Sequence, residues 1–274
     1  MSEIIDKQGE QRKLGCILDN RLTAVWPVFG EGATKGLMLP RSQWTPMTKR
    51  VKWAPAKKRN QGSIGQCNSE ACAYSVEALR RQTGMPHVNL NASWAYGHIN
   101  GGVDQGSSLE AGMAFYMKQG TCSTAFFPDG DWRTRPNGAE KDALRYRVLE
   151  AWYCPTFDHM ASAVQAGFPV VIGIVWGNSD GVDSNNWMAN DPMGGSAGGH
   201  ALCRLQLQND GQRWGLDGPN SWGNWERDGF CIIPESRFSG FTGHWAIRSV
   251  VVNDDELGIP PLQTVAVEEI PELA

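Results

Sequence analysis

Cys67 stands where a glycine-punctuated loop, NQGSIGQC (60–67), runs into a helical pattern. The two glycines let the chain turn tightly just before the helix begins. At the first turn of a helix the unpaired amide N–H groups and the helix dipole favour negative charge, so a thiol there is expected to have a lowered pKa. The sequence therefore predicts a thiolate nucleophile at Cys67. Such a nucleophile needs a base, a residue that orients the base, and donors for an oxyanion.

Three further residues could supply these groups. His200 follows two glycines at the start of an apolar strand pattern, and Asn220 lies in the loop DGPNSWG (217–223) after the next strand pattern. If the two strands pair, the Asn220 side-chain oxygen can accept a hydrogen bond from one imidazole nitrogen while the other faces the thiol. Trp222 could shield this hydrogen bond from water. Gln61, within the glycine turn, could hold an oxyanion together with the backbone N–H of Cys67.

The elements that must position these residues are predicted to be helices in the first half of the chain and strands in the second half. Small and apolar residues recur at helical spacing over 68–81, and more helices are expected over 91–99, 107–120 and 156–167. The apolar run 169–176 predicts a buried strand, and further strands are expected within 198–223, around a hairpin turn at 209–211, and over 229–235 and 244–252. This order favours an α+β fold in which a helical lobe packs against an antiparallel sheet lobe, with a cleft between them.

The three motifs and their order resemble those of the papain-like cysteine peptidases. In that family a Gln–Gly…Cys loop opens the central helix, a GHA segment brings a histidine, and NSWG brings an asparagine. This chain has NQGSIGQC, GGHALCRL and NSWGNWERDGF in the same order, and the resemblance covers about residues 39–250. It implies a two-lobed fold with the active cleft between a helical lobe and an antiparallel, β-barrel-like lobe.

The resemblance also implies a role for each candidate residue. Cys67 would be the nucleophile, His200 the general acid and base, Asn220 the residue that orients the histidine, and Gln61 the side-chain oxyanion donor. For substrate binding we expect two further residues, Gly106 in the stretch DQGSS and Trp222.

The sequence departs from the family pattern in three places. Asn68 follows the nucleophile where the family usually has tryptophan, so the packing beside the thiol must differ. Ile64 stands where secreted members carry a disulfide cysteine, so that bridge cannot form. Residues 1–38 are too short for the family's inhibitory helical propeptide, so activity is either controlled differently or not controlled by a zymogen.

We expect three parts along the chain: an N-terminal extension (1–38), a papain-like peptidase domain (39–252) and an acidic C-terminal tail (253–274). The extension or the tail could dock a protein partner. The formal net charge of −4 gives no reason to expect nucleic-acid binding. The longest apolar run, 169–176, is far short of the ~20 residues that span a bilayer.

The seven cysteines are odd in number and widely spaced, which favours reduced thiols over a disulfide framework. None has the close spacing of a zinc site, so we expect no metal, and no cofactor is predicted. The polar N-terminus shows no signal peptide. We therefore expect a protein of the cytoplasm or of a particle assembled inside a cell.

The sequence predicts a cysteine peptidase that hydrolyses protein or peptide substrates. Two alternatives remain open. The same chemistry could cleave the peptide crosslinks of a cell wall, which would make the chain an amidase. The chain could also be a catalytically idle structural or assembly subunit of a larger particle.

Overall fold

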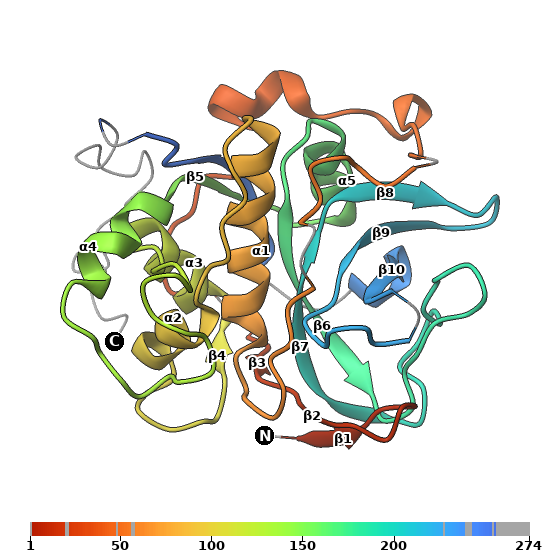
Figure 1. Cartoon of the computed structure of the whole chain (residues 1–274). Coiled ribbons are helices and arrows are strands. Elements are labelled where there is room, and N and C mark those ends of the chain that lie inside the picture. Colours follow the sequence, from red (N-terminus) through yellow and green to blue (C-terminus); the bar gives the residue numbers. More distant parts are fainter. Residues whose placement is uncertain are drawn as a thin grey trace, which may run out of the picture.

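Helix α1 (Cys67–Gln82) stands in the middle of the molecule, between a lobe of helices and a lobe of strands (Figure 1). A computed structural model describes residues 2–19, 22–47, 49–55, 58–226, 228–238, 243–253 and 255. On one side of α1 lie α2 (Ala92–Ile99), α3 (Leu109–Lys118) and α4 (Ala139–Ala143). Helix α5 (Phe157–Gln165) lies with the strands of the other lobe.

A six-stranded sheet connects the two lobes, with the strand order β4-β3-β7-β6-β11-β5. Its strands are β3 (Cys16–Ile17), β4 (Ser107–Ser108), β5 (Val148–Tyr153), β6 (Val170–Gly177), β7 (Ser196–Arg204) and β11 (Trp245–Val250). All of its pairs are antiparallel except β3 with β4. The sheet curls into a half-barrel.

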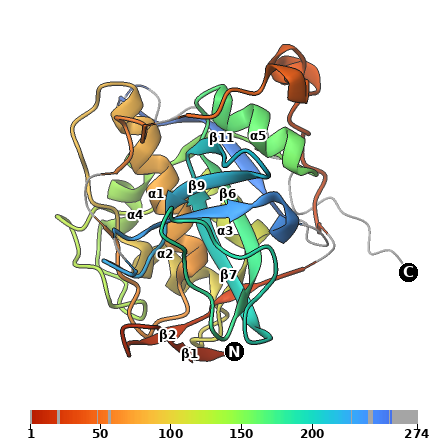
Figure 2. The ribbon, with the colours of Figure 1, turned by 90° about the vertical axis from the view of Figure 1, so that its right-hand side faces the viewer.

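Two smaller sheets complete the architecture. A three-stranded antiparallel sheet contains β8 (Gln206–Asn209), β9 (Trp214–Pro219) and β10 (Phe230–Pro234). A hairpin of β1 (Glu3–Ile5) and β2 (Gln11–Lys13) lies below the lower ends of α1 and β7 in both views (Figures 1 and 2). The helical lobe and the antiparallel half-barrel confirm the predicted fold class.

The longer predicted elements are confirmed, and their ends follow local signals. Ser108 accepts a hydrogen bond from Ala111 N at 3.2 Å and caps α3. Gly211, with φ +91°, closes the β8–β9 hairpin at the predicted turn. The sequence patterns did not predict β5, the five-residue α4 or the short strands β1 to β4. The domain boundaries at 38/39 and 252/253 stay predictions, and most of the acidic tail lies outside the described residues.

Helix α1 differs from its prediction in one respect, because it is buried on all sides. Its small and apolar face was expected, but the structure buries every residue from Cys67 to Arg80. The helix lies between two lobes, so its polar face must be covered too. Buried polar groups need partners, and a neighbouring arginine supplies them to the acidic residues of this face (described below).

All seven cysteines are buried and none is in a disulfide. Within the described ranges, no helix is both long and apolar enough to cross a membrane.

Fully buried His244 makes the fold sensitive to acid. Burial lowers its pKa to about 4, below the value of about 6.5 of an exposed histidine. Its neutral ring accepts a hydrogen bond from Gly173 N at 3.3 Å. Because the unfolded chain binds the proton more readily, the stability from this residue is complete above pH 6.5 and is lost as the pH falls toward 4.

The variant His244→Gln keeps an acceptor for Gly173 but cannot titrate. Between pH 7.5 and pH 5, we expect its free energy of unfolding to fall by about 2 kcal/mol less than that of the wild type. Urea unfolding at the two pH values measures this, and other titrating groups affect both proteins alike. Equal losses in the two proteins would contradict the assignment.

Candidate active site

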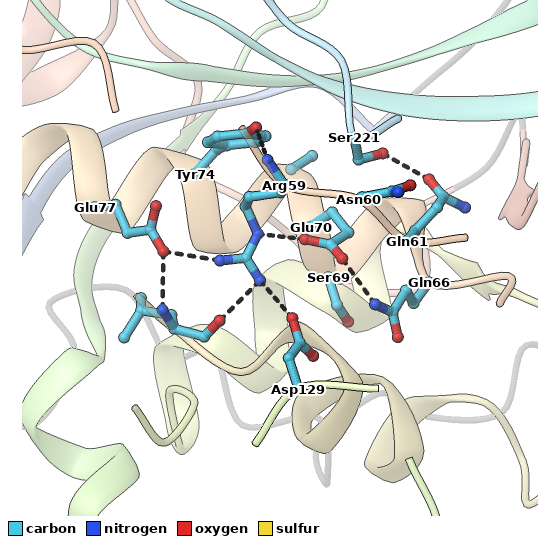
Figure 3. A network of polar contacts seen from close by, with 12 residues as sticks. Arg59, Asn60, Gln61, Gln66, Ser69, Glu70, Tyr74, Glu77, Asp129 and Ser221 are labelled. Atoms are coloured by element: carbon cyan, nitrogen blue, oxygen red, sulfur yellow. Dashed lines mark hydrogen bonds and ion pairs between the residues drawn. The ribbon is translucent and has the colours of Figure 1, made fainter. Parts of the chain in front are cut away.

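The loop 59–66 carries Gln61 and leads into Cys67, and its residues 59–61 are held by the loop that carries Asn220. Gln61 N donates to Ser221 O at 2.8 Å, and Ser221 Oγ donates to Gln61 Oε1 at 2.6 Å (Figure 3). Gly223 N donates to Arg59 O at 2.8 Å. At the N-cap of α1 no side chain makes a capping bond, so amides of its first turn stay available to a neighbouring group.

His200 and Asn220 are in contact, as predicted. His200 Nε2 and Asn220 Oδ1 are 2.9 Å apart, and both side chains are buried. The expected route to this contact was wrong, because β7 and β9 belong to different sheets. They are connected instead by Leu205 N, which donates to Asp217 O at 2.8 Å, and by buried Arg204, which donates to Pro219 O at 2.7 Å.

Aromatic rings enclose the imidazole of His200. The Trp222 ring stacks on it with centroids 4.6 Å apart and planes at 30°, and Trp176 meets it edge-on at 4.9 Å. Burial lowers the His200 pKa to about 4, against the opposing effect of the hydrogen bond that His200 Nε2 donates to Asn220 Oδ1. The imidazole is therefore neutral at pH 7. Its Nδ1 atom has no hydrogen-bond partner among the described residues, which leaves this nitrogen free for a proton transfer.

Cys67 is fully buried, and its pKa is raised to about 11 rather than lowered. Burial outweighs the opposing effect of the Ala201, Gly15 and Asn68 backbones, which lowers the pKa of the thiol. The expectation of a thiolate is thus wrong for this covered state.

The role of Gln61 as an oxyanion donor stays a prediction, and its side-chain N–H groups are engaged in hydrogen bonds in this structure. Its Nε2 atom donates to Lys13 O at 2.9 Å and to Ile64 O at 2.8 Å.

The departure from the family at Asn68 has a local explanation. The side-chain amide of Asn68 donates to Ser107 Oγ at 3.1 Å and to Ser108 O at 2.6 Å. These hydrogen bonds connect α1 to β4. Gly112 on α3 leaves the room for it, since a Cβ at that glycine would lie 2.3 Å from Asn68 Nδ2. A tryptophan could neither fit in this space nor make these hydrogen bonds.

The two residues expected at the substrate site lie in different surroundings. Trp222 is buried against His200 and also lies under Arg12, whose guanidinium carbon is 5.9 Å from the ring centroid. Gly106 has φ +85°, and a Cβ there would lie 2.1 Å from Gly15 O. Both residues contact the N-terminal segment, and their role toward a substrate stays a prediction.

Sequence reasoning missed the buried charge cluster around Arg59 (Figure 3). Arg59 donates to Glu70, to Glu77 at 2.8 Å, to Asp129 at 3.2 Å and to the Leu90 carbonyl at 2.8 Å. Burial raises the pKa of Glu70 to about 7, although Arg59 pulls it down. The signal was present, because two glutamates seven residues apart lie on one face of a helix that is otherwise small and apolar. The described residues include no group of three or more His, Cys, Asp or Glu side chains placed to hold a metal ion.

No protein-family model matches the sequence. An uncharacterized peptidase C1-like protein of Acanthamoeba polyphaga mimivirus is 24% identical over 200 residues, a match that covers 64% of this chain and 63% of that protein. The match therefore spans less than two thirds of that relative.

Solved structures give a closer likeness in fold. Xylellain, a cysteine protease from Xylella fastidiosa, has a TM-score of 0.71 at 22% identity, over 86% of this chain and 96% of that one. A procathepsin B from Trypanosoma congolense has a TM-score of 0.68 at 13% identity, over 88% of this chain and 87% of that one. The chain therefore has the fold of the papain-like cysteine proteases, as the order of its motifs predicted.

Proposed function

We propose that this protein is a cysteine peptidase that hydrolyses peptide bonds with Cys67, His200, Asn220 and Gln61. One observation carries the proposal. The bond between His200 Nε2 and Asn220 Oδ1 leaves Nδ1 unpartnered among the described residues, and the backbone of the next residue, Ala201, lowers the pKa of the Cys67 thiol. A base with a fixed orientation beside a helix-terminal thiol is the arrangement that thiol catalysis needs.

The mechanism follows from these positions. The Cys67 thiol gives its proton to His200 Nδ1 as the sulfur attacks the carbonyl carbon of the substrate. Gln61 Nε2 and the Cys67 N–H donate to the resulting oxyanion. His200 then protonates the leaving amine, the C–N bond breaks, and a thioester remains on Cys67. Water, deprotonated by His200, hydrolyses the thioester and restores the thiol.

A substrate test distinguishes this proposal from the two alternatives, a cell-wall amidase and a catalytically idle subunit. The wild type is incubated at micromolar concentration with a peptide library and, separately, with peptidoglycan, and new amines are detected by mass spectrometry. Cleavage of the library supports the peptidase, and cleavage of peptidoglycan alone supports the amidase. No cleavage of either would favour the idle subunit.

The variant His200→Gln tests the role of the base. Glutamine cannot take the thiol proton at neutral pH, so we expect the rate of library cleavage to fall by about 10³-fold or more. The control is His159→Gln, because His159 is half-buried on α5 and bonded to Thr156 Oγ1 at 2.7 Å. Similar rates for the two variants would sink the assignment of His200.

A further inference from the structure

Gln66, the residue before Cys67, has a backbone conformation that bears on the proposed oxyanion site. It is the N-cap of α1, with φ −99° and ψ 16°, whereas the N-cap residue of a helix is typically extended. Because the peptide bond is planar, ψ of Gln66 sets the direction in which the Cys67 N–H points. The groups that hold Gln66 in this sparsely populated conformation therefore aim a proposed oxyanion donor.

The side chain of Gln66 is held at both of its polar atoms. Its Nε2 donates to Glu70 Oε1 at 2.7 Å, and its Oε1 accepts from Ser93 Oγ at 2.7 Å (Figure 3 shows the bond to Glu70). All three residues are buried. The Gln66 carbonyl also accepts from Glu70 N at 3.0 Å. Glu70 therefore fixes both the side chain and the main chain of Gln66.

These contacts belong to a closed ring of hydrogen bonds, here termed the Gln66 ring, made of Arg59, Gln66, Glu70, Ser93 and Asp129. Arg59 donates to the second carboxylate oxygen of Glu70 and, at 3.2 Å, to Asp129 Oδ2 (Figure 3). Asp129 Oδ1 accepts from Ser93 N at 2.9 Å, which leads back to Gln66. The ring thus connects the loop 59–66 with α1, with the first turn of α2 and with the segment around Asp129.

The donors and acceptors of the ring admit one orientation of the Gln66 amide. Both Glu70 oxygens face groups that can only donate, the Arg59 guanidinium and the Gln66 nitrogen. Ser93 Oγ gives its single proton to Gln66 and accepts from Gly130 N at 2.8 Å. An apolar side chain at position 66 would leave buried oxygens of Glu70 and Ser93 without these partners.

Helix capping does not explain the ring. The Gln66 side chain makes no hydrogen bond to the amides of the first turn of α1. Serine, threonine, aspartate or asparagine at this position would cap the helix, and glutamine is not among the preferred N-cap residues. The side chain serves its own backbone conformation instead, through partners on α1 and α2.

We propose that Gln66 and Glu70 are positioning residues, which hold the N–H of Cys67 in the direction that stabilises an oxyanion. The inference rests on the proposed function and adds two residues that act through Cys67 without touching the substrate. Because the oxyanion exists only during the reaction, loss of this alignment should lower kcat more than it raises KM.

Two reagents that modify Cys67 separate this positioning from a structural role. With p-nitrophenyl acetate the thiol proton goes to His200, the S–C bond forms through an oxyanion, and p-nitrophenolate leaves as the C–O bond breaks. Iodoacetamide alkylates the same sulfur by displacing iodide, and no oxyanion forms. Both reagents need access to the sulfur, so the ratio of acylation to alkylation rates at Cys67 reports the oxyanion donors. Peptide mapping by mass spectrometry measures both rates.

The variant Gln66→Met should lower this ratio about tenfold or more, as part of the effect of losing one oxyanion donor. The matched control is Gln206→Met. Gln206 is 2% exposed, like Gln66, and its Oε1 accepts from Val51 N at 2.9 Å. The control loses a buried hydrogen bond as well, but its ratio should equal that of the wild type.

The double variant Gln66→Glu with Glu70→Gln tests the ring by exchange of its partners. The new carboxylate can accept from Ser93 and from the new amide, whose oxygen can accept from Arg59, and the net charge is unchanged. We expect its ratio to return to within about threefold of the wild type. Gln66→Glu alone places two carboxylates face to face, so its ratio should stay low.

Ser93→Ala covers the case in which Gln66→Met fails to fold. It removes the donor to Gln66 Oε1 and should lower the ratio in the same direction. An unchanged ratio in folded Gln66→Met or Ser93→Ala would overturn the proposal. A wild type that is acylated at Cys67 but cleaves no peptide would keep the positioning and overturn the proposed peptidase. A wild type that is alkylated but never acylated there would overturn both.

Discussion

Replacing Cys67 by alanine is expected to lower kcat/KM for peptide hydrolysis by roughly 10⁴-fold or more. The side chain would be the only group that forms a covalent bond to the substrate, so no neighbour can replace it. The protein should still fold, because the substitution removes a single buried sulfur atom and adds no new group. Steady-state kinetics measures the loss, and thermal unfolding checks the fold.

Cys72→Ala is the matched control for this variant. Cys72 is also fully buried on α1, and its Sγ lies 3.8 Å from Asn68 Oδ1. It should keep nearly all activity while losing a similar amount of side-chain volume. If Cys67→Ala kept full activity, or if both variants lost it equally, the nucleophile would not be Cys67.

Of the substitutions considered, Arg59→Met should lower the free energy of unfolding the most. The substitution leaves Glu70 and Glu77 buried beside α1 without their cation, and breaking such a pair costs about 3–5 kcal/mol. For a chain of this size we expect Tm to fall by roughly 6–20 °C. Differential scanning calorimetry measures the change.

The loss should also depend on pH, in a direction that identifies its cause. Without Arg59 the pKa of each glutamate rises further above its unfolded value, so ionisation costs more as the pH rises. The destabilisation should therefore be larger at pH 8.5 than at pH 6. The control is Arg41→Met, which breaks an exposed network with Asp158 and Glu235 and should cost below about 1 kcal/mol. Equal losses for the two arginines would contradict the argument.

The parts of the fold that were predicted correctly have local causes. The start of α1 at Cys67 follows from a glycine turn before a helical pattern, and the β8–β9 turn follows from Asn209-Asp210-Gly211. The contact of His200 with Asn220 was also predicted, although by way of a strand pairing that does not exist. The order of the motifs was the sound basis for that prediction, whereas the expected pairing of the two strands was wrong.

The position of the N-terminal segment, whose strand β3 pairs with β4 and β7, could not be predicted by the same means. Its contacts are mainly hydrogen bonds of the backbone, which every residue carries and which leave no pattern in the sequence. The prediction of a lowered pKa for the Cys67 thiol was wrong for a related reason. A helix terminus alone favours the thiolate, but the complete burial of Cys67, which depends on how the whole chain packs, reverses this.

The stack of Trp222 on His200 has a consequence for charge. Asn220 is neutral, so no carboxylate balances the imidazolium that forms whenever His200 takes a proton. The electron-rich face of the indole attracts such a cation by about 2 kcal/mol when water is absent. An aromatic quadrupole can thus stabilise the charged intermediate here, without placing a permanent negative charge in the interior.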